Sequence, residues 1–450
     1  TGRKAIGGRW VWKGKYNELG FVTRAKARLV AKGYSQQEEL DCFDTYAPTP
    51  SSSTIRLLAA FANETNRGMV HFDAEQALIQ ADIDTEVLVR LNRALYGLKQ
   101  ASRRWNDRST QVLLGLGFDP SKADPCLFRY ATSFVTVHID DMFVVGTRED
   151  CDALSKALSF EFPTNNLGPL SLHTGCVFAR DWERGQLLIS QTAFINQLCE
   201  RVDVCSSSPT PAAPNARLLP RQEGEGAGNA RLRELIGALI WAADMTRPDI
   251  SNSVRSLTRS SQDPSEEPSK GAIRVLQYLH GSREQGIVYE QGSGLELAAF
   301  ADSSFSGDRA GRRYVSGGAV VFGRAAVPWF SRTQRTVALS TSEAEYMAMG
   351  KVVKEALFVR NILFFMQPQC GVPEGICVYK DNNGAIDLAK NPLSTVRTKH
   401  INVRYHFLGD LVQSKDISIY HVSTERQAAD VLTKALEKES FFRHIKLMNL

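Results

Sequence analysis

The sequence predicts a multidomain protein of the α+β or α/β class. Its 450 residues are 43% hydrophobic and 23% charged, which is ordinary for globular proteins and enough for two or three domains. Short apolar runs typical of strands alternate along the chain with longer runs typical of amphipathic helices. From Ser206 to Ala230 the composition shifts to Ser, Pro, Gly and Ala, so we expect a linker there.

Composition excludes several classes of protein. No run approaches the ~18 consecutive apolar residues of a membrane span, and no signal peptide is visible. The eight cysteines form no C-x-x-C pair, and the closest pairs, Cys199 with Cys205 and Cys370 with Cys377, lack zinc-ligand spacing. We therefore expect reduced, intracellular thiols. Because the first residue is Thr1 rather than Met, we expect a piece of a longer product.

The N-terminal section is basic, although the net charge of the chain is only +5. Residues 1–35 carry nine Lys or Arg and one acid, Glu18. In "FVTRAKARLVAKGY" the cations Arg24, Lys26 and Arg28 alternate with small apolar residues, which predicts a strand with three cations on one face. Such a row suits phosphates, and a merely solvated face is an equal alternative on charge alone.

The remaining elements follow from periodicity and from capping residues. Ser340 with Glu343, and Thr424 with Gln427, have the spacing of capping boxes at helix starts. The predicted helices cover 54–65, 96–118, 231–245, 269–282, 340–366 and 423–438. The predicted strands cover 68–73, 134–139, 142–145, 295–305, 313–323 and 375–381.

Asp140 and Asp141 stand inside the apolar stretch "FVTVHIDDMFVVG" and predict a hairpin turn. A turn alone is the usual explanation, but two adjacent carboxylates repel each other unless a cation lies between them. Asp73 ends a predicted strand and supplies a third carboxylate if the strands are neighbours. Two Mg²⁺ ions would neutralise this group and clamp the attacking and leaving oxygens of nucleotidyl transfer.

A second group of acids follows in the last third of the chain. Asp302 and Asp381 end predicted strands, Glu345 lies on the long helix, and Asp430 lies on the predicted last helix. Four such acids match the needs of two-metal phosphodiester hydrolysis, with His421 as a proton shuttle. Each acid alone is better explained as a helix cap or a solvated charge, and His421 alone as a surface histidine.

At this point the motifs resemble one family closely. The chain is similar to the reverse transcriptase and ribonuclease H region of copia-type retrotransposon Pol polyproteins over about residues 8–440. "YGLKQA" and "TKHINVRYHF" are the most specific phrases, whereas the Asp-Asp hairpin is not. The other matching phrases are "KARLVAKGYSQ", "TIRLLAA", "FDAEQALI", "LYGLKQASRRW", "HIDDMFVVG", "RPDISNSV", "FADSSFSGDR", "TVALSTSEAEYMA", "KDNNGAIDLAKNP", "RTKHINVRYHF" and "QAADVLTKAL".

The resemblance implies a right-hand polymerase followed by a ribonuclease H-like mixed-sheet domain. Fingers and palm would cover 8–180, thumb and connection 181–293, and the ribonuclease H-like domain 294–440. The resemblance implies that the polymerase metal ligands are Asp73, Asp140 and Asp141, and that the ribonuclease H ligands are Asp302, Glu345, Asp381 and Asp430, with His421 nearby. It also implies that Lys26 and Arg28 grip the triphosphate, and that Leu78 and Gln100 line the nucleotide pocket.

The implied function is RNA-directed DNA synthesis with degradation of the RNA strand of the hybrid. Its cofactor would be Mg²⁺, two ions per active site, with Mn²⁺ as the alternative. Its partners would be an RNA template, a DNA primer, the RNA–DNA hybrid and deoxynucleoside triphosphates, with no membrane. The expected location is the cytoplasm, in virus-like particles, with the nucleus as an alternative.

Three departures from the family pattern keep an alternative open. His138 stands where the family has Tyr, and Leu78 stands where it has a Phe that blocks a ribose 2′-hydroxyl. The segment between Ile79 and Leu91 is shorter than in the family. The alternative is a decayed element with an inactive polymerase that keeps ribonuclease H activity or nucleic-acid binding. An unrelated metal-dependent nuclease explains only the second group of acids.

Overall fold

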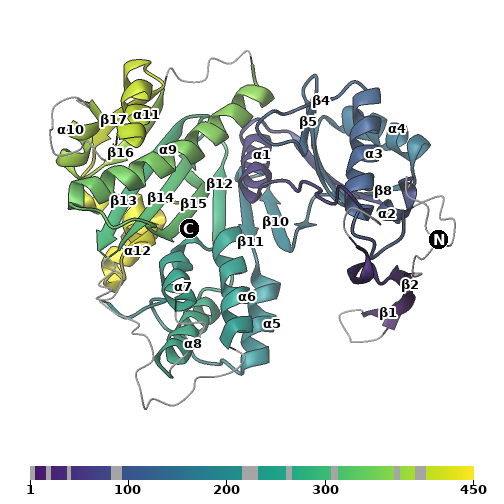
Figure 1. Cartoon of the computed structure of the whole chain (residues 1–450), viewed down its shortest axis with the longest axis horizontal. Helices are drawn as coiled ribbons and strands as arrows, with labels where there is room; N and C mark the ends of the chain where they lie inside the picture. The colour runs from purple at the N-terminus through teal and green to yellow at the C-terminus, as the bar shows by residue number, and fades with distance from the viewer. Residues whose placement is uncertain are drawn as a thin grey trace. The chain divides into compact units, whose positions relative to one another are not determined.

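The structure is a computed structural model with a mixed α/β architecture (Figure 1). It describes residues 6–16, 22–37, 42–82, 94–214, 232–259, 266–305, 313–368, 375–390 and 402–450. The short segment after Ile79 and most of the predicted linker therefore lie outside the described residues. The chain divides into two compact units, one of residues 1–51 and 67–170 and the other of residues 52–66 and 171–450. The division into three parts at 180 and 293 stays a prediction.

The first unit is built on a six-stranded sheet in the order β4-β5-β6-β7-β3-β8, in which all neighbours are antiparallel. A separate hairpin pairs β1 with β2 and confirms the strand expected from alternation of cations. The strands are β1 (Gly8–Tyr16), β2 (Val22–Ala31), β3 (Gly68–Ala74), β4 (Asp119–Pro120), β5 (Leu127–Tyr130), β6 (Ser133–His138), β7 (Asp141–Gly146) and β8 (Thr164–Pro169). The helices are η1 (Gly33–Ser35), α2 (Ala77–Gln80), α3 (Ala101–Gly115) and α4 (Arg148–Glu161).

Helices α3 and α4 cover one face of this sheet. Trp105 and Leu113 of α3 and Leu154 of α4 are buried in one core with Phe72 of β3 and Met142 of β7. Burying side chains of this size contributes roughly 1.5–3 kcal/mol each, so the core fixes the register of the central strands. The predicted helix 96–118 is shorter than expected, because α3 begins only at Ala101.

The second unit contains two sheets and most of the helices. A four-stranded sheet has the order β12-β11-β10-β9, and its described pairs are antiparallel. Its strands are β9 (Leu172–His173), β10 (Cys176–Asp181), β11 (Gln186–Ser190) and β12 (Gly286–Glu290). The helices of this part are α1 (Ser52–Glu64), α5 (Thr192–Val202), α6 (Leu232–Met245), η2 (Pro248–Ile250), α7 (Ser251–Thr258) and α8 (Glu266–Gly281).

The five-stranded sheet of the second unit is mixed. Its order is β15-β14-β13-β16-β17, with antiparallel pairing up to β13 and parallel pairing beyond it. Its strands are β13 (Leu297–Phe305), β14 (Tyr314–Phe322), β15 (Ala325–Thr333), β16 (Ile376–Lys380) and β17 (Ile417–His421). Figure 1 shows α9 crossing this sheet. The helices are α9 (Thr341–Met366), α10 (Asn383–Lys390), α11 (Asn402–Gln413), η4 (Thr424–Arg426), η5 (Ala428–Leu432) and α12 (Lys438–Lys446).

Helix α9 begins as its sequence predicts. The hydroxyl of Ser340 accepts a hydrogen bond from the amide of Glu343 at 3.1 Å, and the Glu343 carboxylate accepts one from the amide of Leu339 at 2.7 Å. These bonds satisfy donors that a helix start leaves free. Because these bonds fix where α9 begins, they also fix the side of the sheet on which Glu345, in the first turns of the helix, lies.

Helix α1 belongs to the second unit although residues 67–170 of the first unit follow it in the chain, and Arg56 explains why. The buried Arg56 guanidinium donates to the carbonyls of Val327 at 2.7 Å and of Asp244 and Met245, both at 2.9 Å. It also lies over the ring of Trp329 at 4.0 Å. A buried cation needs every donor satisfied, so α1 is tied to β15 and to the end of α6.

The motif "RPDISNSV" has a structural role in this unit. Arg247 and Asp249 are fully buried, and Arg247 donates to the Asp249 carboxylate at 2.7 Å. Tyr278 of α8 donates to the same carboxylate at 2.6 Å. The pair therefore fastens η2 to α8. Among the described residues, no helix is both long and apolar enough to cross a membrane.

Candidate functional site

The hairpin between β6 and β7 carries the first acidic group, which we call the hairpin acids: Asp73, Asp140 and Asp141. The two-residue turn is Ile139 and Asp140, not Asp140 and Asp141 as predicted, because Asp141 pairs with His138 as the first residue of β7. Ile139 has φ of 55°, which is costly for a β-branched residue. Its carbonyl accepts a hydrogen bond from Trp105 Nε1 of α3 at 2.7 Å, which holds the strained turn in place.

Strand register brings Asp73 to the same place. Asp73 of β3 lies directly opposite Asp141 of β7, and the amide of Ala74 donates to the carbonyl of Asp140 at 2.8 Å. Residues directly opposite in an antiparallel pair project on the same face of the sheet. Asp73 and Asp141, separated by more than 60 residues in sequence, therefore lie side by side at one end of β3 and β7, and Asp140 is in the adjoining turn.

Tyr96 lies beside this group and was missed by sequence reasoning, although it stands in the specific phrase "YGLKQA". Burial raises the pKa of the Tyr96 phenol, the negative charges of Asp140 and Asp73 raise it further, and Arg28 opposes them. The guanidinium of Arg28 lies 5.0 Å from the centre of the Tyr96 ring. Tyr96 therefore connects a cation of β2 to the hairpin acids.

His71 is a second residue that sequence reasoning missed. It precedes Asp73 by two positions, so both side chains leave the same face of β3. The His71 Nε2 atom lies 3.0 Å from Asp141 Oδ1, and the Asp141 side chain is 41% exposed. The period of two along β3 was the signal that could have found it.

The predicted nucleotide-pocket residues lie in the loop before α3 and on α2. Gln100 is buried, and its Oε1 accepts a hydrogen bond from Gln36 Nε2 at 2.9 Å. The Gln36 Oε1 accepts from the amide of Lys99 at 2.8 Å, which ties this loop to the residue that follows η1. Leu78 packs against the core below the sheet. The side chain of Lys26 lies outside the described part of the chain.

The second group, which we call the pocket acids, is Asp302, Glu345, Asp381 and Asp430. Carboxylate oxygens of Asp302, Asp381 and Asp430 lie within 4.8 Å of one another. Asp302 lies inside β13 and not at its end as predicted, because β13 continues to Phe305 along β14. The parallel ladder with β16 stops at Phe300 and Tyr379, so Asp302 still faces the place where β16 ends and Asp381 follows.

The predicted helix over 423–438 is wrong. The segment forms two short 3₁₀ turns, η4 and η5, and Asp430 lies in η5. Gln427 explains the break, because its Nε2 donates to the carbonyl of Ala301 of β13 at 3.0 Å. Gly317 of β14 permits the close approach, since a Cβ there would lie 2.6 Å from the Thr433 side chain. Contact with the sheet overrides the local helical pattern.

Two lysines stand among the pocket acids. Lys380 Nζ lies 3.0 Å from Glu345 Oε2 and 3.9 Å from Asp302 Oδ1, and it donates to Asp381. Lys434 Nζ lies 3.3 Å from Asp302 Oδ2 and 3.1 Å from Asp430 Oδ1. The Thr433 hydroxyl also donates to Asp302. Neither lysine was expected from the sequence, although Lys380 directly precedes Asp381 and Lys434 follows Asp430 by four residues.

Burial and mutual repulsion shift the protonation of these acids. Burial, followed by the charge of Asp302, raises the pKa of Glu345 to about 8 in spite of Lys380. The same two causes raise the pKa of Asp430 to about 6. Burial would also raise the pKa of Asp381, but the Lys380 ammonium outweighs it and lowers that pKa below its ordinary value. Without an added cation, Glu345 therefore retains its proton at neutral pH.

The pocket acids fit a divalent cation. Asp302 is 1% exposed, and among the described residues its buried Oδ1 accepts no hydrogen bond. Hard carboxylate oxygens are the ligands that Mg²⁺ prefers. His421 is exposed at the end of β17 and stands opposite Lys380 in the strand register.

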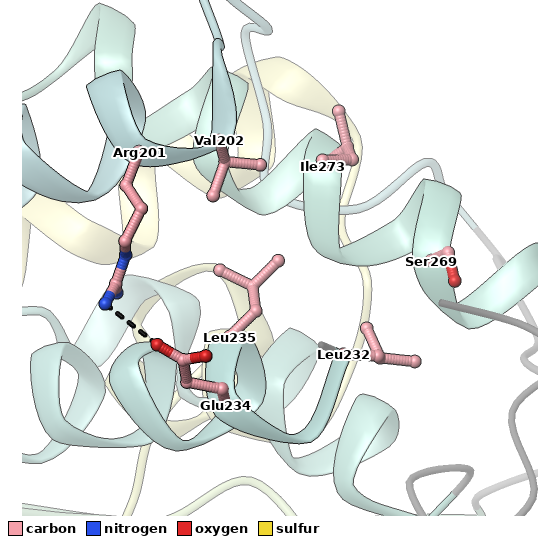
Figure 2. Close-up of a pocket in the computed structure, with 7 residues that line it drawn as sticks. All are labelled: Arg201, Val202, Leu232, Glu234, Leu235, Ser269 and Ile273. Atoms are coloured by element: carbon pink, nitrogen blue, oxygen red, sulfur yellow. Dashed lines mark hydrogen bonds and ion pairs between the residues drawn. The ribbon is translucent and has the colours of Figure 1, made fainter. Parts of the chain in front are cut away.

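A separate pocket of about 550 Å³ lies among α5, α6 and α8, and it contains none of the predicted site residues (Figure 2). Its polar feature is an ion pair at 2.9 Å between Arg201 and Glu234, both more than half exposed. The walls are otherwise mainly apolar, so this pocket does not offer a set of metal ligands. Its lining residues are Arg201, Val202, Leu232, Glu234, Leu235, Ser269 and Ile273.

Comparison with known proteins identifies relatives across the chain. The family model described as "Reverse transcriptase (RNA-dependent DNA polymerase)" matches residues 1–91 and 85–214. The "Retrovirus-related Pol polyprotein from transposon RE1" of Arabidopsis thaliana is 32% identical over 461 residues, covering 97% of this chain and 31% of the relative. The corresponding protein from transposon TNT 1-94 of Nicotiana tabacum is 29% identical over 470 residues, covering 98% and 35%.

Two solved structures are also similar. A foamy virus protease–reverse transcriptase is 11% identical, with 97% of this chain and 52% of that chain covered and a TM-score of 0.23. The N-terminal RNase H domain of the Mycobacterium tuberculosis protein rv2228c is 13% identical, with 34% and 98% covered and a TM-score of 0.23. The chain spans about a third of the length of the curated relatives named above. On the sequence matches, the chain resembles copia-type retrotransposon Pol polyproteins over nearly its whole length.

Proposed function

We propose that the chain is an RNA-directed DNA polymerase with ribonuclease H activity, working on retrotransposon RNA. Two observations carry this proposal: the pairing of Asp73 with Asp141 in the first unit, and the cluster of Asp302, Asp381 and Asp430 in the second. The first unit would serve as fingers and palm of a right-hand polymerase. The sheet of β13 to β17 would serve as the ribonuclease H-like domain, with the intervening helices as thumb and connection.

In the first unit, the hairpin acids would hold divalent ions against the primer 3′-oxygen and the triphosphate. Asp73, Asp140 and Asp141 would be the ligands, and Mg²⁺ would supply charge stabilisation of several kcal/mol in the transition state. Arg28, with Lys26 from the same strand, would contact the triphosphate. Leu78 and Gln100 would border the nucleotide pocket.

In the second unit, the pocket acids would hold divalent ions against a phosphodiester of the RNA strand, and His421 would move a proton at the rim. A groove of about 670 Å³ supports nucleic-acid binding here. Lys434, which touches two pocket acids, lines this groove with the cations Arg255, Lys270 and Arg274. Phosphate neutralisation by such cations is the main source of nucleic-acid affinity. Mg²⁺, with Mn²⁺ as the alternative, at two ions per site remains the prediction from the sequence.

The test is primer extension on an RNA template with Mg²⁺, beside cleavage of an RNA–DNA hybrid. Asp140→Asn should reduce synthesis alone and Asp381→Asn cleavage alone, each by roughly 10³-fold or more, because a metal ligand is lost. Matched controls are Asp152→Asn on α4 and Asp387→Asn on α10, both of which are exposed and belong to neither group of acids. Synthesis that survives Asp140→Asn would remove the assignment of the hairpin.

The second candidate function is ribonuclease H activity alone, in an element whose polymerase has decayed. The short segment after Ile79 favours it, because that segment lies between strands that carry hairpin acids. Misplacement of a catalytic group by ~1 Å can cost ~100-fold in rate. Cleavage without synthesis in the unaltered chain would establish this candidate over the first.

A further inference from the structure

The ammonium group of Lys380 occupies one side of the pocket acids. Its Nζ contacts three of the four carboxylates: Glu345 at 3.0 Å, Asp302 at 3.9 Å, and Asp381 through a hydrogen bond. The Lys380 side chain is 0% exposed. It is therefore enclosed by the residues that would be ligands.

Lys434 stands on the other side and differs in one respect. It contacts Asp302 at 3.3 Å and Asp430 at 3.1 Å, but its side chain is 33% exposed. Asp302 directs Oδ1 toward Lys380 and Oδ2 toward Lys434, so two ammonium groups flank one carboxylate. Two divalent ions sharing a bridging carboxylate, about 3.5–4 Å apart, would need these same two places.

The two lysines should respond differently to an incoming ion. Lys434 can swing its flexible stem into solvent, where its charge is hydrated again. Lys380 can leave only by carrying a charge through the packed end of β16, and removing it would leave buried carboxylates unpaired, which is strongly unfavourable. An ion can therefore replace Lys434 readily but not Lys380.

We propose that Lys380 is a built-in cation that takes the place of the second divalent ion, so that the pocket binds a single divalent ion. That ion enters between Asp302, Asp381 and Asp430 and displaces the Lys434 ammonium. Glu345 acts on the ion site through its ion pair with Lys380. Lys380 is a positioning residue for the pocket acids. This inference rests on the ribonuclease H function proposed above for the same residues.

The test counts Mn²⁺ bound to the full chain, using electron paramagnetic resonance of the free ion. The hairpin acids bind ions of their own, so each protein is compared with its Asp302→Asn derivative, and the difference counts the ions in the pocket. The Asp302→Asn substitution should remove one equivalent of bound Mn²⁺ from the otherwise unaltered chain. In the Lys380→Met background the difference should be two equivalents, and in the charge-preserving Lys380→Arg background it should remain one.

Lys434→Met is the matched control, because it removes the other lysine of the same cluster. It should keep the count at one and tighten Mn²⁺ binding by about tenfold, because the ion no longer has to displace an ammonium from Asp302 and Asp430. A loss of two equivalents, or of none, from the unaltered chain would overturn the proposal. That measurement needs no Lys380 variant, so it decides even where Lys380→Met does not fold.

Failure of this inference can be told apart from failure of the proposed function. Hybrid cleavage is assayed on the same preparations. A count of one without any cleavage removes the proposed function and leaves the ion count standing. Cleavage with a count of two removes the role of Lys380 and leaves the function standing.

Discussion

The hairpin acids and the pocket acids solve the same electrostatic problem in different ways. Asp141 of the hairpin is 41% exposed and pairs with His71, so water screens its repulsion from Asp73 and Asp140. Asp302 of the pocket is 1% exposed and has two lysine partners. A half-exposed group of acids is stabilised by water in the absence of bound cations, whereas a buried group needs cations that belong to the fold.

The largest difference should appear when one internal cation is removed. In the presence of a chelator, Lys380→Met should destabilise the sheet of β13 to β17 by about 3–5 kcal/mol, since breaking a buried ion network leaves uncompensated charge. Hydrogen exchange of the β13 and β16 amides measures this, and exchange in β3 and β7 of the other unit is the internal control. Added Mg²⁺ should restore most of the loss. Unchanged protection in β13 would contradict the comparison.

The second largest difference between the hairpin acids and the pocket acids should appear in the pH dependence of the free energy of unfolding. The folded pKa of Glu345 is about 8 and that of Asp430 about 6, both above the ordinary values of 4.5 and 3.8. The folded state therefore binds these protons more tightly, and metal-free stability should fall as pH rises from about 5 to 8, by at most ~1.4 kcal/mol per pH unit for each proton.

The measurement is urea unfolding with a chelator at several pH values, with Glu345→Gln beside the unaltered chain. The variant keeps the shape of the side chain and removes its titration, so its stability should fall less steeply with pH. Mg²⁺ should flatten the unaltered curve, because the ion replaces the protons. Equal slopes in the two proteins would show that Glu345 does not hold the raised pKa.

A smaller effect is expected at the hairpin turn. Trp105→Phe removes the hydrogen bond from Nε1 to the carbonyl of Ile139 while keeping most of the buried ring. The loss should be about 1 kcal/mol, the usual net contribution of such a bond, with faster hydrogen exchange at β6 and β7. Synthesis should fall more than hybrid cleavage. An equal loss of both activities would show general instability instead.

The smallest effect should follow His71→Gln. The pair of His71 with Asp141 is partly exposed, and such pairs contribute roughly 0–1 kcal/mol. Thermal unfolding should therefore change little, in contrast to Lys380→Met. A loss as large as that of the lysine variant would abolish the distinction between a solvated and a buried group of acids.

The sequence alone determined much of this protein. Periodicity indicated strand β3, the hairpin strands and most long helices, and the spacing of Ser340 and Glu343 marked the start of α9. These features could be predicted because they depend on neighbours within a few residues. The same local patterns placed an acid at or near the end of β3 and β16.

Only the tertiary structure decided which groups share a site. Strand register set Asp73 opposite Asp141, and contact of Gln427 with β13 replaced the expected helix around Asp430 by 3₁₀ turns. Lys380 reads as an ordinary strand residue, yet parallel pairing of β13 with β16 encloses it among three acids. Local periodicity says which face a side chain leaves, but the partner across that face is fixed by packing between distant segments.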